Sequence, residues 1–298
     1  MFNKTLIIFI LGICSSVEII WGQSKNSDYL IACGEDKAII INTKKSNQDH
    51  VDIVWKWNAG ETLGLPKEYI NLFTKMDECK PVKNGKKLLM SASSSGVVLL
   101  EKSTKKALFY AKAPNAHSAE YLPGNRIIVA LSTAKNGNSI WLYDVNKPNE
   151  VLFKDSLYSA HGVIWIPERK RLYALGYNIL RAYSLKNWNT SKPSLQLENV
   201  WDLPANGGHD ISRISKDKLL ITTSRKVIEF DIVNSSFQPF MPLRNTPDVK
   251  SVNFIAKTGE LIYTKGEIKW WTHHIYLKNP DKVLSIKDIN LYKVRVYK

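Results

Sequence analysis

Cysteine is scarce in this chain, with three among 298 residues. So few cysteines exclude a small disulfide-stapled domain and a cysteine-rich zinc module, because both need several closely spaced thiols. Long apolar runs are also missing. Beyond the first residues, no run approaches the roughly 20 residues that a membrane-spanning helix needs. The sequence therefore predicts no membrane span, and it carries no feature that fixes an oligomeric state.

Acidic residues are few, with 27 Asp and Glu against 42 Lys and Arg, so the net charge is +15. The lysines are scattered and form only short runs such as Lys44-Lys45 and Lys86-Lys87. This pattern does not favour a nucleic-acid partner. An acidic polysaccharide is a more compatible polyanion. The alternative is that the lysines only keep strand edges soluble and unpaired.

The first residues have the pattern of a secretory signal. Lys4 precedes an apolar run at residues 6–13, which is too short to cross a membrane. Cleavage after Gly22 leaves residues 23–298 as a single predicted domain, with residues 1–22 as the signal peptide. The expected location is therefore secreted or periplasmic.

The three cysteines leave two questions open. Cys14 offers an alternative lipid anchor, although the residue before a lipidated cysteine is normally small and Ile13 is not. Cys33 and Cys79 remain after cleavage. They form either a disulfide in an oxidising compartment or two separate buried thiols, because the sequence does not fix their distance.

An internal repeat organises the rest of the chain. Three segments share a His, an aliphatic residue five positions later, a polar turn and an apolar strand; they begin at His117, His161 and His209. Weaker copies begin at Asp77 and Lys250, and successive anchors are 40 to 48 residues apart. This period is typical of a four-stranded propeller blade, about 40–50 residues long.

The chain ends complete the count of blades. Three strands, at residues 28–34, 38–43 and 52–58, precede the first anchor, and one strand at residues 291–298 is left over. We therefore expect an all-β, six-bladed propeller whose C-terminal strand completes the first blade, which removes exposed sheet edges. The alternatives are an open pair of β-sandwich sheets or a seven-bladed ring.

One segment departs from the β pattern. Residues 65–76 have helical periodicity, which predicts a loop with a short helix. The enclosing insertion, residues 59–76, is long enough to overhang the channel as a lid.

The repeat also predicts a site. In a propeller the innermost strand of each blade follows the central channel, so equivalent residues at its start meet at one mouth. His117, His161 and His209 are expected to converge there, with Asp77 and Lys250 beside them. Three neutral imidazoles can hold one divalent ion such as Mn, Ni, Fe or Zn, or one can act as a general base. The alternative is that the histidines only set the register of the blades.

Other residues of the inner strands join this hypothesis. The predicted catalytic residues are His117, His161, His209 and Arg213, and the same three histidines are the predicted metal ligands. The predicted substrate-binding residues are Asp77, Lys80, Glu120 and Lys250. Asp210 follows His209 directly and is expected to point to the opposite side of an extended strand.

Four motifs carry a family resemblance: Asp77-Glu-Cys-Lys-Pro, Ser93-Ser-Ser-Gly-Val-Val-Leu-Leu, Ala116-His-Ser-Ala-Glu-Tyr-Leu-Pro and Ala160-His-Gly-Val-Ile-Trp. With them the chain resembles secreted bacterial six-bladed propellers of unassigned function. It is more loosely similar to oligogalacturonide lyases, whose propeller holds a metal through inward histidines. That second likeness implies histidine ligands at His117, His161 and His209, but the lyase propeller has seven blades and a fourth ligand is not evident here.

These observations leave two classes of function. The first is an enzyme acting on a uronate-containing glycan, by metal-assisted lyase chemistry. The second is a non-catalytic propeller that binds carbohydrate or protein at the same mouth. Because propellers support both classes, the fold does not choose between them.

Overall fold

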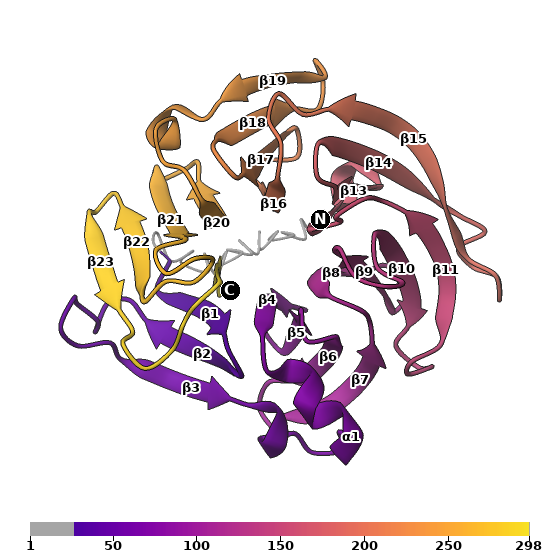
Figure 1. Ribbon diagram of the computed structural model, residues 1–298, viewed down its shortest axis with the longest axis horizontal. Coiled ribbons are helices and arrows are strands. Elements are labelled where there is room, and N and C mark those ends of the chain that lie inside the picture. The colour runs from indigo at the N-terminus through magenta and orange to yellow at the C-terminus, as the bar shows by residue number, and fades with distance from the viewer. Residues whose placement is uncertain (1–26, 298) are drawn as a thin grey trace, which may run out of the picture.

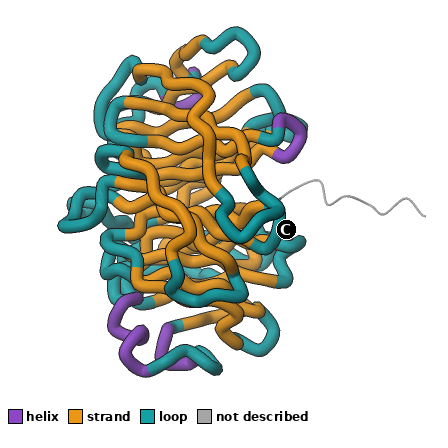
Figure 2. The backbone as a smooth tube through the Cα atoms, turned by 90° about the vertical axis from the view of Figure 1, so that its right-hand side faces the viewer, coloured by secondary structure: helices purple, strands orange, loops and turns teal. Residues whose placement is uncertain are grey.

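The computed structural model describes residues 27–297, and six antiparallel sheets of four strands stand around a common axis in it. Figure 1 shows the sheets following one another in chain order around the ring, with the inner strands nearest its centre. Viewed from the side, the strands run between two faces on which the loops gather (Figure 2). The predicted six-bladed propeller is confirmed.

The blades are numbered here in chain order. Blade 1 contains β1 (Tyr29–Gly34), β2 (Lys37–Asn42), β3 (Ile53–Trp57) and β24 (Lys293–Val296). Blade 2 contains β4 (Met76–Val82), β5 (Lys87–Ala92), β6 (Gly96–Glu101) and β7 (Lys106–Lys112). Blade 3 contains β8 (Ala116–Leu122), β9 (Arg126–Leu131), β10 (Ser139–Asp144) and β11 (Val151–Ser156).

The second half of the ring repeats this plan. Blade 4 contains β12 (Gly162–Ile166), β13 (Arg171–Leu175), β14 (Ile179–Lys186) and β15 (Ser194–Asp202). Blade 5 contains β16 (Gly208–Arg213), β17 (Lys218–Thr223), β18 (Val227–Asp231) and β19 (Ser236–Pro239). Blade 6 contains β20 (Val249–Ile255), β21 (Glu260–Lys265), β22 (His274–Lys278) and β23 (Lys282–Ser285).

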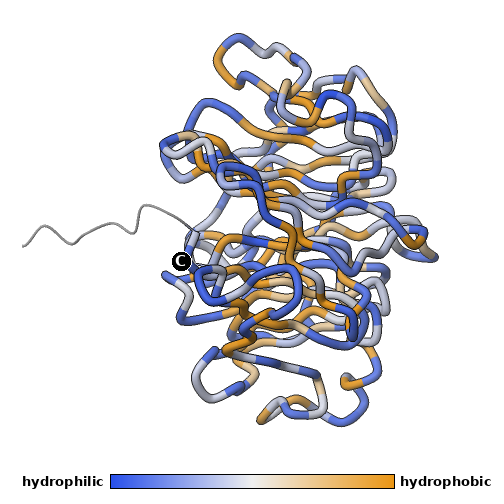
Figure 3. Tube along the Cα trace, turned by 90° about the vertical axis from the view of Figure 1, so that its left-hand side faces the viewer, coloured by the Kyte–Doolittle hydropathy of each residue, from blue (hydrophilic) through white to orange (hydrophobic). Residues whose placement is uncertain are grey.

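Neighbouring blades are held together by apolar layers. Strand β9 is buried along its whole length, and its residues alternate between two such layers. Ile127 and Val129 pack toward blade 2, whereas Ile128 and Ala130 pack toward blade 4. Because both faces of a blade are covered, these strands read as continuous apolar runs (orange stretches in Figure 3).

The ring closes through its two chain ends. Strand β24 pairs antiparallel with β1, in a register that places Cys33 opposite Lys293 and Leu30 opposite Val296. Blade 1 therefore has the order β24-β1-β2-β3, with the C-terminal strand innermost. This confirms the predicted closure.

The insertion between blades 1 and 2 is helical, as predicted, but it is not a lid. It holds α1 (Lys67–Ile70) between the 3₁₀ turns η1 (Ala59–Glu61) and η2 (Asn71–Phe73), while Met76 already opens β4. The remaining 3₁₀ turns of the described chain are η3 (Pro167–Arg169) and η4 (Met241–Leu243). Figure 1 places α1 at the rim of blade 2.

Close packing explains why the insertion stays at the rim. Phe73 is buried and stacks edge-on against Trp57, with 5.8 Å between ring centroids. A Cβ on Gly96 of β6 would lie 2.5 Å from the Leu72 carbonyl oxygen, so only glycine admits this approach. The insertion is thus packed against blade 2 rather than poised over the channel.

The remaining sequence predictions have mixed outcomes. Cys33 and Cys79 are both free and buried, and burial, together with the neighbouring Cys79, raises the pKa of Cys33. The predicted signal peptide at residues 1–22, with Cys14, lies outside the described residues. In residues 27–297, no helix has the length and apolar character to cross a membrane.

Candidate functional site

The repeat anchors occupy equivalent positions at the starts of the inner strands. Asp77, His117, His209 and Lys250 each fall where the register with the neighbouring strand skips one residue, which is the mark of a β-bulge. A bulge turns the extra side chain out of the regular alternation. His161 and Tyr292 directly precede β12 and β24, and their backbone N–H groups donate to Leu175 and Cys33.

These six positions form a ring at one end of the channel. The ring centroids of His117 and His161 are 4.3 Å apart, and those of His161 and His209 are 5.6 Å apart. Tyr292 completes the circle at 6.4 Å from His117. The predicted convergence of the three imidazoles is confirmed. Tyr292 was not predicted, because its repeat is divided between the two ends of the chain.

Backbone carbonyls fix the tautomers of two of the rings. Nδ1 of His117 lies 3.0 Å from the Asn115 carbonyl oxygen, and Nδ1 of His161 lies 2.8 Å from that of Ser159. A carbonyl oxygen only accepts, so both Nδ1 atoms carry the hydrogen and both Nε2 atoms present a lone pair. Burial lowers the pKa of His117 to about 4 and lowers that of His161 well below its usual value. Both rings are therefore neutral at pH 7.

His209 and Lys250 form a pair of nitrogen groups. Nζ of Lys250 lies 3.2 Å from Nε2 of His209. Nδ1 of His209 is buried and has no hydrogen-bond partner among residues 27–297. Burial, reinforced by Lys250, strongly lowers the pKa of His209, and burial also lowers the pKa of Lys250.

Asp77 supplies a carboxyl group at the same mouth. Its Oδ2 accepts the backbone N–H of Ser93 at 2.5 Å, and its Oδ1 lies 3.6 Å from Nε2 of His117. Burial raises the pKa of Asp77 to about 7, although Ser93 and Lys293 oppose this. The group can therefore hold or release a proton near neutral pH.

The ring opens into a cavity of about 440 Å³, which we call the histidine mouth. Besides the six ring residues it is lined by Lys75, Ser93, Asn115, Ser132, Thr133, Trp270 and Trp271. Both tryptophans come from the loop between β21 and β22. Trp271 packs edge-on against Tyr292 at 5.7 Å, and Trp270 is 61 % exposed. The mouth thus combines neutral imidazoles, lysines and an open aromatic face.

A buried ion cluster lies among the inner strands. Arg295 donates to Glu78 at 2.9 and 2.8 Å and to Asp210 at 2.8 and 2.6 Å. Lys293 adds contacts of 3.6 and 3.3 Å to the same two carboxylates. Burial alone would raise the pKa of Glu78, but Arg295 and Lys293 outweigh it and hold the pKa far below its usual value. The cluster separates the two ends of the channel.

The position predicted for Asp210 is wrong. The Asp210 side chain points into the channel, as that of His209 does. There it binds Arg295 and Lys293 across the axis. The bulge at His209 inserts one residue between Gly208 and Asp210, so strict alternation fails at this point.

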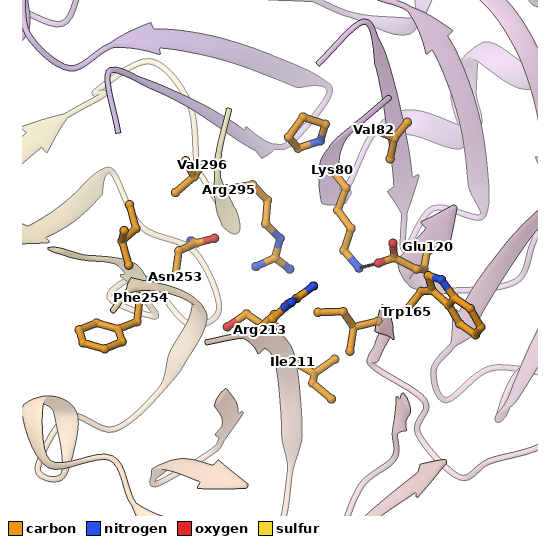
Figure 4. A pocket seen from close by; sticks show the side chains of 14 residues that line it. Lys80, Val82, Glu120, Trp165, Ile211, Arg213, Asn253, Phe254, Arg295 and Val296 are labelled. Carbon is orange, nitrogen blue, oxygen red and sulfur yellow. Dashed lines mark hydrogen bonds and ion pairs between the residues drawn. The ribbon is translucent and has the colours of Figure 1, made fainter. Parts of the chain in front are cut away.

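A second cavity, of about 400 Å³, lies at the other end of the inner strands, and we call it the far mouth. It contains Lys80, Glu120 and Arg213, three residues that were expected beside the histidines (Figure 4). Lys80 pairs with Glu120 at 2.8 Å, and Arg213 pairs with Glu168 at 2.6 Å. The single predicted pocket is therefore two, and these three residues do not share a cavity with His117, His161 and His209.

The nitrogen atoms at the histidine mouth do not form a ready metal site. Nε2 of His209 is occupied by Lys250, and Nε2 of His117 faces Asp77. In residues 27–297, no group of three or more His, Cys, Asp or Glu side chains is placed to hold a metal ion. The donor set does not fit the predicted divalent ion, so the metal stays a prediction from sequence.

Fold and cavity together define a six-bladed β-propeller with a polar, aromatic-rimmed pocket at one mouth of its channel. The chain belongs to the family of unknown function DUF6528, whose profile matches residues 9–297. No curated protein matches the chain. The expected likeness to unassigned six-bladed propellers is thus confirmed for family and blade number, whereas the likeness to oligogalacturonide lyases stays a prediction.

Proposed function

We propose that the histidine mouth binds an acidic, uronate-containing glycan. The observation that carries this proposal is the combination of the bare Nε2 atom of His161, two lysines and an exposed tryptophan around one cavity of about 440 Å³. A cavity of this size suits one or two sugar units. The protein's net charge of +15 favours the approach of a polyanion.

Each group has a role in this binding mode. Lys75 attracts the sugar carboxylate, Lys250 donates a hydrogen bond to it, and the Nε2 atom of His161 accepts a hydrogen bond from a sugar hydroxyl group. Trp270 presents an open ring against which the apolar face of a sugar can pack. An exported protein that meets polysaccharide in its surroundings is consistent with the predicted signal peptide.

A second candidate function is elimination from the bound glycan, and the state of Asp77 favours it. Elimination breaks the C–H bond next to the carboxylate and the C–O bond on the neighbouring carbon, and a C=C bond forms. Asp77, whose pKa is raised to about 7, takes the C–H proton in its ionised form and passes it to the leaving oxygen. This version needs no metal ion.

Calorimetric titration with uronate oligosaccharides tests the binding proposal. We expect Lys250→Met to weaken binding about tenfold or more, since a charge-assisted hydrogen bond contributes roughly 1.5–3 kcal/mol. Lys80→Met at the far mouth is the matched control and leaves the affinity unchanged. Trp270→Ala, at an exposed position, also weakens binding. Equal affinities for all three variants and the wild type would overturn the proposal.

The two candidate functions differ in the fate of the bound glycan. An ultraviolet absorbance rise from the new C=C bond indicates elimination, and its loss in Asp77→Asn with retained affinity assigns the acid. Binding without this absorbance leaves a carbohydrate-binding propeller. If no glycan binds but the mouth captures a peptide, the proposal is wrong and a protein-binding propeller replaces it.

A further inference from the structure

Three lysines project from the inner strands, and their hydrogen-bond partners differ. Lys80 donates to Glu120 at 2.8 Å and to the Val163 carbonyl oxygen at 2.6 Å. Lys293 lies between Asp210 and Glu78, at 3.3 and 3.6 Å. Both lysines are therefore paired with close carboxylates. Lys250 instead faces an imidazole nitrogen, that of His209.

The surroundings of Lys250 disfavour its charge. Its side chain is 3 % exposed, and within residues 27–297 the only carboxylate in ion-pair reach is Asp248, at 3.6 Å and itself 54 % exposed. Solvent weakens such an outer partner. The imidazole of His209 cannot replace a carboxylate, because it is neutral. The positive charge of Lys293 in β24 also helps to lower the pKa of His209.

The loop between β21 and β22 holds the side chain in place. A Cβ on Gly266 would lie 3.3 Å from Cε of Lys250 and 2.5 Å from the Lys269 carbonyl oxygen, so glycine lets the loop close over the lysine stem. Lys250 nevertheless lines the histidine mouth. A confined amine facing an open cavity, with a weak counter-ion, has the arrangement of a lysine nucleophile.

We propose that Lys250 is a carbonyl-reactive amine, which forms an imine with a small aldehyde or 2-oxo acid in the histidine mouth. The neutral nitrogen attacks the carbonyl carbon and a C–N bond forms. The C–O bond then breaks, and the oxygen leaves as water with the two amine protons. This inference goes beyond the proposed function, because it needs the cavity but no glycan.

The chemistry of the mouth favours a carbonyl compound that also carries a carboxylate. Charged and titratable groups from five blades surround the amine. They are Asp248 directly before β20, His209 of blade 5, His161 of blade 4, Lys293 of blade 1, and Lys75 and Asp77 of blade 2. Glu78 and Asp210 balance the charge of Lys293, so the cation that lines the mouth besides Lys250 is Lys75, and Asp77 is half protonated near pH 7. An anionic carbonyl compound is therefore attracted more strongly than a neutral one.

Reductive trapping tests the proposal on the full chain. The protein is incubated near pH 7 with glyoxylate and cyanoborohydride, digested, and analysed by mass spectrometry for carboxymethylated lysines. We expect Lys250 to be labelled several-fold faster than Lys80, because Lys80 is bound by the Glu120 carboxylate whereas Lys250 faces a neutral imidazole. Acetaldehyde in place of glyoxylate should show a smaller preference. In the denatured chain the preference should vanish.

Variants make the result specific. Asp248→Asn removes the remaining counter-charge and should accelerate labelling of Lys250. Asn also tolerates the positive φ of 55° at this position. Asp36→Asn, at another exposed aspartate, is the matched control and leaves the rate unchanged. Labelling of Lys250 no faster than Lys80, or none at all, overturns the proposal. Neither result decides whether a glycan binds, because affinity is measured without an aldehyde.

Discussion

At the residue scale, the histidine mouth contains side chains whose charges differ between the folded and unfolded chain. Burial raises the pKa of Asp77 to about 7, from an ordinary value of 3.8. Burial lowers the pKa of His117 to about 4, from 6.5. The first shift favours the folded state in acid, and the second favours it at neutral pH. The two groups therefore oppose each other, and single variants separate them.

Asp77→Asn should change how stability depends on pH. Between about pH 4 and 7 the native Asp77 keeps a proton that the unfolded chain releases, so its contribution to the free energy of unfolding falls as pH rises. Asn cannot ionise and still accepts the Ser93 N–H. We expect the free energy of unfolding of the variant, relative to that of the wild type, to rise by about 3–4 kcal/mol from pH 4 to pH 8. Urea unfolding at both pH values measures this, with exposed Asp36→Asn as the control; a difference between variant and wild type that stays constant with pH contradicts it.

His117→Gln should change the pH dependence of stability in the opposite direction. Between about pH 6.5 and 4 the unfolded chain gains a proton on this ring that the native state refuses, so stability falls as the pH falls. The free energy of unfolding should therefore fall by about 3 kcal/mol less in the variant than in the wild type over this range. Unfolding curves at pH 4.5 and 7.5 measure the difference. His50→Gln, at an exposed ring, should behave as wild type, and an equal effect from both substitutions would show that the mouth is not responsible.

At the scale of elements, each inner strand begins at the histidine mouth and ends at the far mouth. Lys80 and Glu120 stand three residues after their anchors, and Arg213 stands four after its own. At about 3.3 Å per residue, that is roughly 10–13 Å along the channel, enough to reach the other end. The repeat therefore predicts which residues are equivalent in successive blades. It does not predict how far along the channel those residues lie.

Other parts of the site were hidden from sequence reasoning for different reasons. The bulges at His117 and His209 have no characteristic residue pattern, so the sequence predicts the wrong side of the strand for the Asp210 side chain. Trp270 and Trp271 lie in an irregular loop outside the repeated strands, where periodicity carries no information. The blade count, in contrast, follows from a period that every blade must keep. Strand pairing was predictable, and the loops and bulges were not.

The ion cluster on β24 gives a prediction at this scale. Arg295→Met leaves Glu78 and Asp210 buried without their main partner, which should cost about 3–5 kcal/mol in the free energy of unfolding. Arg213→Met breaks only a half-exposed pair with Glu168, so it should cost less than about 1 kcal/mol. Denaturant unfolding of the two variants tests this. Similar losses in both would mean that Arg295 does not act through its buried carboxylates.

At the scale of the whole molecule, β24 connects blade 1 with three other blades. It pairs with β1, and its Arg295 binds Glu78 of blade 2 and Asp210 of blade 5, which lie on opposite sides of the ring. Asn253 of blade 6 also donates to the Val294 carbonyl oxygen at 2.9 Å. The closing strand therefore contributes hydrogen bonds to the edge of one blade and charges to the centre of the ring. Both mouths depend on this end of the chain, since Tyr292, directly before β24, lines the histidine mouth and Arg295 lines the far mouth.

Removing residues 291–298 should consequently prevent the ring from forming, and not merely weaken it. The shortened chain keeps an unpaired β1 edge and two buried carboxylates that have lost Lys293 and Arg295, so we expect it to elute as aggregate and to lose its cooperative unfolding transition. A synthetic peptide of residues 290–298 should restore a monomer in gel filtration, because the missing strand can add to the open edge. The same peptide with Arg295 replaced by Met should restore it less well, and a scrambled peptide should not restore it. A shortened chain that stays monomeric and melts like the full protein would show that the blades hold the ring without this strand.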